Sequence, residues 1–279
     1  MNAYLDLVRR VLDEGVRKPS RTGVDTISAF SVSYRVDLAQ GFPLLTTKKM
    51  LWKSVLHELL WYLSGDDHIR NLREHTKIWD AWADADGNLD TAYGHYWRRF
   101  PSAERDENGE WRVREVDQIR NVLDALKTQP DSRRLVVTAW EPGNAWSSKL
   151  PPCHYTYCFQ VLDGKLNCHL TQRSGDVALG IPFNLAAYAA LTQVLAQQAG
   201  LGVGTFAHTI VDAHIYTDKP DGSMSEYDHV PGLLKQLERT PGPLPKLTIA
   251  DKPLDELTFD DFELTGYECQ PFLSFKVAV

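Results

Sequence analysis

The sequence predicts an α+β fold in which a mixed β-sheet is packed with helices on one side. Strand-like and helix-like stretches are interleaved without the regular spacing of βαβ units. The Asp163-Gly164 pair between two alternating runs is a strong signal for a two-residue hairpin, so part of the sheet is antiparallel. Residues 183–199 add a long, nearly all-apolar helical stretch.

Apolar side chains at helical spacing predict three further helices. They cover Tyr4 to Leu12, Leu51 to Leu63 and Val116 to Leu126, the last of which ends before Pro130.

Alternating or continuous apolar runs predict the strands. The expected strands are Phe30–Val36, a buried Leu135–Trp140, the hairpin pair Tyr155–Leu162 and Lys165–Gln172, and Phe206–Tyr216.

Three segments have the composition of loops. Residues 101–115, approximately, are polar and charged and predict an exposed excursion. Residues 217–232 are rich in Pro, Gly, Ser and Asp and predict a surface insertion, and residues 241–245 predict a rigid turn. No linker, repeat or low-complexity tract divides the sequence, so we expect a single domain over residues 1–279.

The composition excludes several classes of protein. With 43% hydrophobic and 24% charged residues the chain resembles an ordinary globular protein, and its net charge of −7 argues against DNA or RNA as a partner. No apolar run approaches the ~20 residues that span a membrane, and the first residues do not resemble a secretory signal. Four cysteines in such a chain indicate reduced thiols, so we expect a cytoplasmic protein.

Cys153 is the first candidate for chemistry because it follows two prolines at the entry to a strand, where it could face a cleft. Only a thiolate is a good nucleophile, so this role needs a nearby cation. The alternative is a buried structural cysteine, since free cysteine is among the most buried residue types. A zinc site built from Cys153, Cys158, Cys168 and the histidines that follow two of them is disfavoured, because the spacing is wrong and alternate residues of a strand face opposite ways.

Arginines beside hydroxyl residues could supply that cation and bind a small phosphate. They occur at Arg21, at Arg133 and Arg134, and at Arg173 next to Ser174. Each cluster alone is compatible with a surface ion pair.

Glu58 lies inside the apolar stripe of a predicted helix. If buried, its carboxyl would have a raised pKa and could act as a general acid or base; the alternative is a helix-flank residue that reaches solvent.

Asn184 lies at a helix start, where it could cap the helix or read the donor–acceptor edge of a pyrimidine. His214 and Tyr216 share one face of a strand, either as a binding pair or as satisfied polar residues of the core.

Taken together, the motifs resemble the folate-dependent, cysteine-using thymidylate synthase family, including the related pyrimidine-nucleotide hydroxymethylases. The matches follow in order over nearly the whole chain. They are Arg21–Gly23, Phe42–Lys49, His57–Trp61, Ile78–Asp80, Tyr93-Gly94, Asp131–Arg134, Pro152–His154, Gln172–Ser174 with Asp176, Pro182–Asn184, and Asp212 with His214 and Tyr216.

This resemblance implies the reductive methylation of dUMP by 5,10-methylenetetrahydrofolate to dTMP and dihydrofolate. Cys153 would add to C6 of uracil and make C5 a carbon nucleophile, and Glu58 would assist proton transfers through water. It also implies a homodimer with sheets back to back, in which Arg133 and Arg134 cross to the partner subunit's site. No metal is implied.

The residues implied by the resemblance fall into three groups. The catalytic group is Cys153, Glu58, Tyr93 and Asp176. The dUMP group is Arg21, Arg133, Arg134, Gln172, Arg173, Ser174, Asn184, His214 and Tyr216. The folate group is Ile78, Trp79, Leu150, Asp176, Gly180, Phe183 and Val279, the last in a C-terminal tail that closes over the folate.

The chain departs from the family pattern near these pockets. Lys276 stands where a proline is usual before the last residues, and an insertion follows Tyr216. The other departures are Ile210-Val211, Thr217–Lys219, Ala178 and Ala187.

The sequence leaves two other functions open. A nucleotide C5-hydroxymethylase would use the same folate with water in place of hydride, and exclusion of water at the reacting carbon decides between the two. A catalytically silent nucleotide- or RNA-binding homologue is disfavoured by Cys153, Glu58 and the acidic balance.

Overall fold

The computed structural model describes residues 1–278, which form a six-stranded mixed sheet with helices against one face. The strand order is β1-β2-β8-β7-β6-β5. β7 and β8 pair in parallel, and every other neighbouring pair is antiparallel. This confirms the predicted fold class.

The strands of this sheet follow the predicted alternation. Their bounds are β1 Val16–Lys18, β2 Thr26–Asp37, β5 Val136–Thr138, β6 Thr156–Leu162, β7 Lys165–Asp176 and β8 Gly202–Tyr216. The buried strand expected at Leu135–Trp140 is shorter than predicted, because only three of its residues pair with β6 at the sheet edge.

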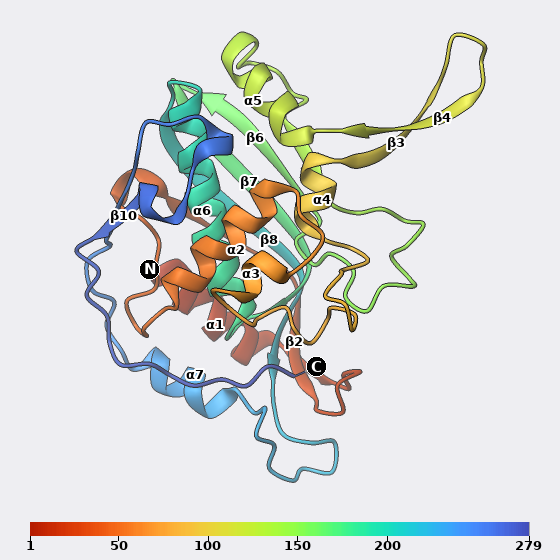
Figure 1. The fold of residues 1–279 in the computed structure, drawn as a ribbon. Coiled ribbons are helices and arrows are strands. Elements are labelled where there is room, and N and C mark those ends of the chain that lie inside the picture. Colours follow the sequence, from red (N-terminus) through yellow and green to blue (C-terminus); the bar gives the residue numbers. More distant parts are fainter. Residues whose placement is uncertain (279) are drawn as a thin grey trace.

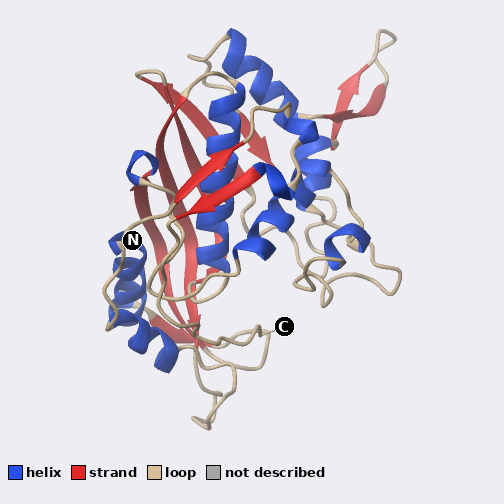
Figure 2. Cartoon of the chain, turned by 60° about the vertical axis from the view of Figure 1, so that its left-hand side comes forward, coloured by secondary structure: helices blue, strands red, loops and turns tan. Residues whose placement is uncertain are grey.

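The helices bury the apolar stripes that predicted them. Their bounds are α1 Asn2–Glu14, α2 Trp52–Ser64, α3 Arg70–Arg73, α4 Tyr93–Arg98, α5 Gln118–Thr128, α6 Gly180–Gln198 and α7 Val230–Leu237. Figures 1 and 2 show α6 running along one face of the sheet, and its all-apolar sequence is explained by burial on nearly every side. Short 3-10 turns lie at Leu38–Gln40, Leu254–Glu256 and Phe259–Asp261.

Two small hairpins lie outside the main sheet. β9 Lys246–Ile249 pairs with β10 Phe262–Thr265, and β3 Phe100–Arg105 pairs with β4 Trp111–Val116. The exposed excursion expected near residues 101–115 is therefore the ordered β3–β4 ribbon, which projects from the body in Figure 1. The insertion expected at 217–232 ends earlier than predicted, because α7 begins at Val230.

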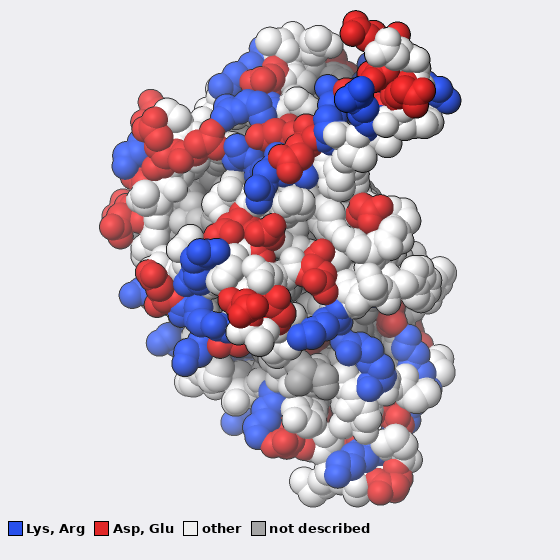
Figure 3. Space-filling view, turned by 45° about the vertical axis from the view of Figure 1, so that its right-hand side comes forward, with Lys and Arg blue, Asp and Glu red and all other residues white. Residues whose placement is uncertain are grey.

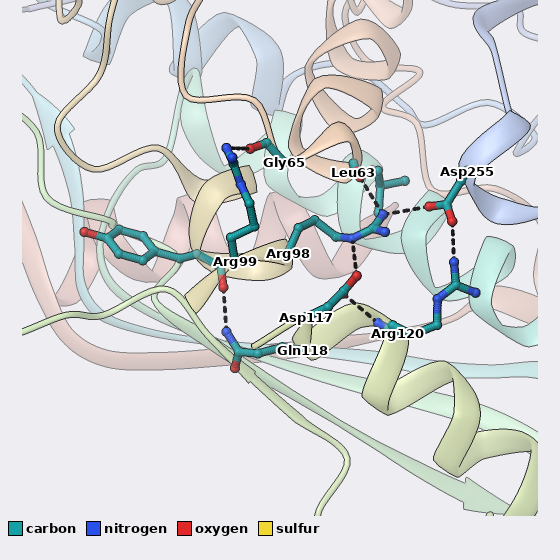
Figure 4. A network of polar contacts seen from close by, with 9 residues as sticks. Leu63, Gly65, Arg98, Arg99, Asp117, Gln118, Arg120 and Asp255 are labelled. Carbon is teal, nitrogen blue, oxygen red and sulfur yellow. Dashed lines mark hydrogen bonds and ion pairs between the residues drawn. The ribbon is translucent and has the colours of Figure 1, made fainter. Parts of the chain in front are cut away.

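A polar network fastens the base of the projecting ribbon (Figure 4). Arg98, just before β3, contacts Asp117, just after β4, at 3.0 Å, and Asp255 at 2.9 Å. Asp117 also caps α5 by accepting a hydrogen bond from the backbone N–H of Arg120. Because the Arg98 side chain is only 16% exposed, these bonds are less weakened by water than ordinary surface pairs.

The surface in Figure 3 carries acidic and basic side chains interspersed, without a continuous basic region on that face. Within residues 1–278, no helix combines the length and the apolar character needed to cross a membrane.

Candidate functional site

Cys153 lies in the loop between β5 and β6, and its backbone is fixed from two sides. Its N–H donates to the Tyr93 hydroxyl at 2.6 Å, and its carbonyl accepts from the backbone N–H of Arg173 at 2.8 Å. The side chain is half-buried, so the thiol is neither on the open surface nor sealed in the core.

The Arg173 guanidinium lies against this thiol. Nη2 is 3.5 Å from Cys153 Sγ and donates to the carbonyl of Pro151 at 2.6 Å, while Nε donates to the carbonyl of Pro152 at 3.0 Å. The proline-rich loop thus holds the guanidinium at the sulfur, as the sequence predicts for a candidate nucleophile.

The pKa of the Cys153 thiol is nevertheless raised. Burial raises it, and the positive charges of Arg173 and Arg21 lower it without offsetting the burial. The expectation that nearby arginines favour the thiolate is correct in sign for each charge, but it omitted the larger cost of removing the sulfur anion from water.

Glu58 is buried in α2, with 7% of its surface exposed, so the reading as a solvent-reaching helix flank is wrong. Trp79 Nε1 donates to its Oε1 at 2.7 Å. Burial raises the pKa of this carboxyl to about 7, although hydrogen bonds from Trp79 and Tyr62 act in the opposite direction. A group with this pKa can both accept and release a proton at neutral pH.

Aromatic residues connect the Glu58 region to the cysteine loop. The Tyr62 ring is 5.2 Å from the Tyr93 ring, and Tyr93 stacks on His154 at 3.7 Å with nearly parallel planes. His154 Nδ1 lies 2.8 Å from the Tyr188 hydroxyl, and burial lowers the pKa of His154 to about 3, so its ring is neutral at pH 7. Tyr93 therefore bridges the two catalytic candidates.

The nucleotide candidates on β7 and β8 share one end of the sheet. Ser174 Oγ is 3.5 Å from His214 Nδ1, and the His214 and Tyr216 rings are 5.3 Å apart on the same face of β8. Gln172 is buried. Its Nε2 donates a hydrogen bond to the Ser174 carbonyl at 2.9 Å, and its Oε1 lies 3.0 Å from Nε2 of His208. The expected shared face of His214 and Tyr216 is present, close to the cysteine loop.

Asn184 does not cap α6, because the helix begins at Gly180 and its N-cap is Leu179, without a side-chain cap bond. Its side chain is 8% exposed in the second helical turn. The capping alternative is therefore wrong, and the base-reading hypothesis stays a prediction.

The arginines divide into two sets. Arg21 is exposed in the loop after β1, and its charge influences both Cys153 and Tyr216. Arg133 and Arg134 are exposed in the segment just before β5. There Arg133 lines an open hollow of about 760 Å³ together with residues of β6 and β7. Within one chain, the structure does not bring Arg133 or Arg134 to Cys153.

The folate candidates gather near Glu58 and the start of α6. Trp79 and Leu150 line one small hollow, Ile78 precedes Trp79, and Gly180 and Phe183 lie in the first turns of α6. Val279 lies outside the described residues.

Asp176 ends β7 and accepts hydrogen bonds from the backbone N–H groups of Ala178 at 2.8 Å and Leu179 at 3.2 Å. His229 Nδ1 is 3.5 Å from its carboxylate. Burial raises the pKa of Asp176, but His229, His214 and the Ala178 N–H more than offset it, so the pKa lies below its usual value.

Two residues of this region carried no role in the sequence analysis. Lys48 is buried, donates from Nζ to the Ala178 carbonyl at 2.6 Å, and has its pKa lowered by burial to about 8. It lies in the matched stretch Phe42–Lys49, which was the available signal. His229 is the last residue of the predicted insertion before α7, and no local pattern pointed to it. Among residues 1–278, no three His, Cys, Asp or Glu side chains are grouped so that they could hold a metal ion.

Comparison with known proteins agrees with this geometry. The family model for thymidylate synthase matches residues 2–279. The chain belongs to the thymidylate synthase family. A curated relative, the thymidylate synthase of Haloferax volcanii, is 57% identical over 241 residues, which are 82% of this chain and 70% of the relative.

Membership in this family makes the chain a folate-dependent methyltransferase that uses 5,10-methylenetetrahydrofolate. The resemblance seen in the motifs is thereby confirmed. The hydroxymethylase alternative is not favoured, since both the family model and this relative carry the name of the synthase.

Proposed function

We propose that this chain converts dUMP and 5,10-methylenetetrahydrofolate to dTMP and dihydrofolate, with Cys153 as the nucleophile toward C6 of the uracil. The observation that carries this assignment is the position of Cys153 Sγ, 3.5 Å from a guanidinium that two loop carbonyls hold in place. Addition of a thiolate to C6 turns the otherwise unreactive C5 into a carbon nucleophile and so divides one difficult step into easier ones.

The thiol must lose its proton before it attacks, and Arg173 is placed to stabilise the anion that forms. Glu58 would move protons at the base and the folate through water, which its pKa of about 7 supports. Tyr93 would hold the cysteine backbone through its hydroxyl, so that Sγ keeps its direction.

The nucleotide would lie with its phosphate on Arg21, Arg173 and Ser174, since guanidinium and hydroxyl donors match phosphate oxygens. Its base would meet Asn184 and Gln172, and its ribose His214 and Tyr216. The convergence of Ser174, His214 and Tyr216 at one end of the sheet supports this orientation.

The folate supplies the one-carbon unit and the hydride. We assign its contacts to Ile78, Trp79, Leu150, Asp176, Gly180, Phe183 and Val279. The indole of Trp79 and the carboxylate of Glu58 are joined by a hydrogen bond, and this pairing of a flat apolar wall with a polar group fits a pterin ring.

A homodimer completes the site in this proposal. The helix-free face of the sheet leaves apolar side chains exposed, among them Phe30 at 83%, Val136 at 46% and Val211 at 37%. A second copy packed on this face would form an isologous interface and would bring Arg133 and Arg134 toward the partner's nucleotide. The four unpaired cysteines support a cytoplasmic location.

The proposal is tested by incubating the protein with both substrates, following the absorbance of dihydrofolate and identifying the nucleotide by mass. We expect dTMP with stoichiometric dihydrofolate. Cys153→Ser should abolish turnover and retain dUMP binding, because only the nucleophile is lost. Hydroxymethyl-dUMP without dihydrofolate, or substantial turnover by Cys153→Ser, would contradict the assignment.

The shared site is tested by mixing inactive variants. Arg133→Ala subunits and Cys153→Ser subunits should each be weak or inactive as homodimers, and mixing them should restore part of the activity. In such heterodimers one site has both an intact Cys153 and an intact partner arginine. No recovery, with subunit exchange demonstrated by mass spectrometry, would contradict a site shared between subunits.

A further inference from the structure

Three polar side chains form a row across the face of the sheet that packs into the hydrophobic core. Tyr34, His208 and Gln172 lie on the adjacent strands β2, β8 and β7. His208 and Gln172 are buried, and the two residues that flank His208 on the same face of β8, Phe206 and Ile210, are fully buried and apolar. Polar groups in such a place cost free energy unless each one is hydrogen-bonded.

Hydrogen bonds connect this row to the candidate nucleotide site. Tyr34 and His208 are directly opposite each other in the pairing of β2 with β8, and the Tyr34 hydroxyl lies 3.0 Å from His208 Nδ1. His208 Nε2 lies 3.0 Å from Gln172 Oε1. Gln172 Nε2 in turn donates to the carbonyl of Ser174 at 2.9 Å. The row therefore begins on β2, outside the site, and ends at a residue of the proposed nucleotide site.

The donor and the acceptor of every bond in this chain are fixed by its last member. The Ser174 carbonyl can only accept, so the amide group of Gln172 that faces it is the NH₂ group, and the amide oxygen faces His208. That oxygen also only accepts, so His208 Nε2 carries a proton.

The protonation states of the other two members agree with this direction. Burial lowers the pKa of His208 to about 3, so at pH 7 its ring is neutral and holds one proton, which leaves Nδ1 as an acceptor. Burial raises the pKa of the Tyr34 hydroxyl, which therefore keeps its proton and donates it to Nδ1. Each bond is thus donated in the same sense, from Tyr34 through His208 and Gln172 to Ser174.

The chain determines what Gln172 can offer to a ligand. An amide that turned over would place its oxygen against the Ser174 carbonyl and its NH₂ group against the proton of the imidazole, so both bonds would be lost. In the observed direction one N–H of Gln172 is used by Ser174, and the second N–H is left for a ligand.

The amide nitrogen of Gln172 lies at the beginning of α6. A Cβ atom on Gly175 would collide with Ile181 and would lie 3.2 Å from Gln172 Nε2, so the glycine makes room for both side chains. Asn184 follows Ile181 by three residues and so lies on the same side of α6, one turn further along. The fixed amide is therefore close to the residue that we assign to the base.

We propose that Tyr34 and His208 are positioning residues that hold the Gln172 amide in one direction, so that it presents a donor to the nucleotide base and never an acceptor. The inference rests on the nucleotide site proposed above. Uracil has a carbonyl oxygen at C4, which accepts, whereas cytosine has an amino group there, which donates. The chain thus favours dUMP over dCMP, together with Asn184.

The test measures the dissociation constants of dUMP and dCMP by calorimetric titration without folate, so that no turnover occurs. The ratio of the dCMP constant to the dUMP constant reports the selectivity. His208→Phe keeps a flat ring but removes the donor to Gln172, so the ratio should fall about five- to tenfold. Tyr34→Phe no longer enforces the direction but does not forbid it, so the ratio should fall about two- to threefold.

His208→Gln is the conservative variant, because its amide can donate to Gln172 and accept from Tyr34. It should keep the ratio of the unmodified protein within about twofold, since the bonds that it replaces are each worth a similar amount. A ratio that falls in His208→Gln as far as in His208→Phe would contradict the proposal.

Two control variants separate selectivity from a general loss of packing. Phe206→Leu disturbs a buried ring 5.7 Å from that of His208 and leaves the chain intact. Tyr157→Phe removes a buried hydroxyl that has no hydrogen-bond partner among residues 1–278, and it is matched to Tyr34→Phe. Both should leave the ratio unchanged. If His208→Phe does not fold, the comparison of Tyr34→Phe with Tyr157→Phe decides. An unchanged ratio in Tyr34→Phe, or an equal fall in the controls, would overturn the proposal.

A second readout requires no nucleotide. Nitrogen-15 NMR of the histidine rings at pH 7 distinguishes a protonated from an unprotonated ring nitrogen, and the His208 signals are those missing in His208→Gln. We expect the proton on Nε2 in the unmodified protein. A proton on Nδ1 would reverse the chain and overturn the proposal. If the unmodified enzyme makes no dTMP, the proposed function has failed, whatever the state of the His208 ring.

Discussion

Glu58 is a buried carboxylate and Asp176 a partly buried one in the same candidate site, and their pKa values are shifted in opposite directions. Glu58 lies on α2 among aromatic rings, and its pKa is raised to about 7. Asp176 lies at the end of β7 beside His229 and backbone N–H groups, and its pKa is lowered. Burial penalises the charge of both, so the partners decide the outcome.

The opposite pKa shifts indicate that the two carboxyl groups have different roles. An anion held by an imidazole and two backbone amides is a fixed structural charge, which suits the loop before α6. A carboxyl whose main partner is a neutral indole can change its protonation state near neutral pH, which suits proton transfer.

The largest expected effect comes from removing the titratable group. Glu58→Gln keeps the size of the side chain and its acceptor for Trp79, but it cannot take up or release a proton. We expect kcat to fall by about 10²- to 10⁴-fold. The inflection near pH 7 in the dependence of kcat on pH should also disappear. The measurement is kcat between pH 5.5 and 9, and activity within tenfold of the unmodified enzyme would exclude a proton-transfer role.

Much of this site could be predicted from the sequence because the signals are local. Glu58 stands between the apolar pairs Val55-Leu56 and Leu59-Leu60, which made it a candidate for a buried carboxylate, although the sequence alone left a solvent-reaching helix flank open. The two prolines before Cys153 predict a constrained backbone that holds the thiol in place. The hairpin at Asp163-Gly164 fixes which residues of β6 and β7 are neighbours.

What could not be predicted depends on contacts between distant segments. His229 meets Asp176 only because α7 returns to the end of β7, and nothing around His229 in the sequence signals that approach. The same holds for Lys48 against Ala178. The raised pKa of Cys153 depends on the balance between burial and two distant charges, which residue spacing does not reveal.

Stability measurements would sharpen the comparison, because the two carboxylates contribute to stability with opposite signs. The pKa of Glu58 is raised, so its ionisation destabilises the folded state as pH rises from about 4.5 to about 7. Glu58→Gln should therefore be more stable than the unmodified protein at pH 8, by at most about 3 kcal/mol, and the difference should shrink toward pH 5. Asp176→Asn should be less stable at pH 8, since a lowered pKa contributes stability that is lost only as pH falls through it. Urea unfolding at pH 5, 6.5 and 8 measures both, and shifts of the same sign in the two variants would contradict the contrast.

The smallest expected effect tests whether partners, rather than burial alone, set the pKa of Glu58. The Trp79 Nε1 hydrogen bond favours the ionised carboxylate, so Trp79→Phe should raise the Glu58 pKa further. Loss of one such bond to a charged group corresponds to a shift of about one pH unit in the midpoint of the kcat profile. Trp82→Phe is the matched control, because it removes a neighbouring indole, 5.6 Å from that of Trp79, and leaves the bond to Glu58 intact. A midpoint that stays in place in Trp79→Phe, or moves equally in both variants, would mean that the Trp79 hydrogen bond does not help to set this pKa.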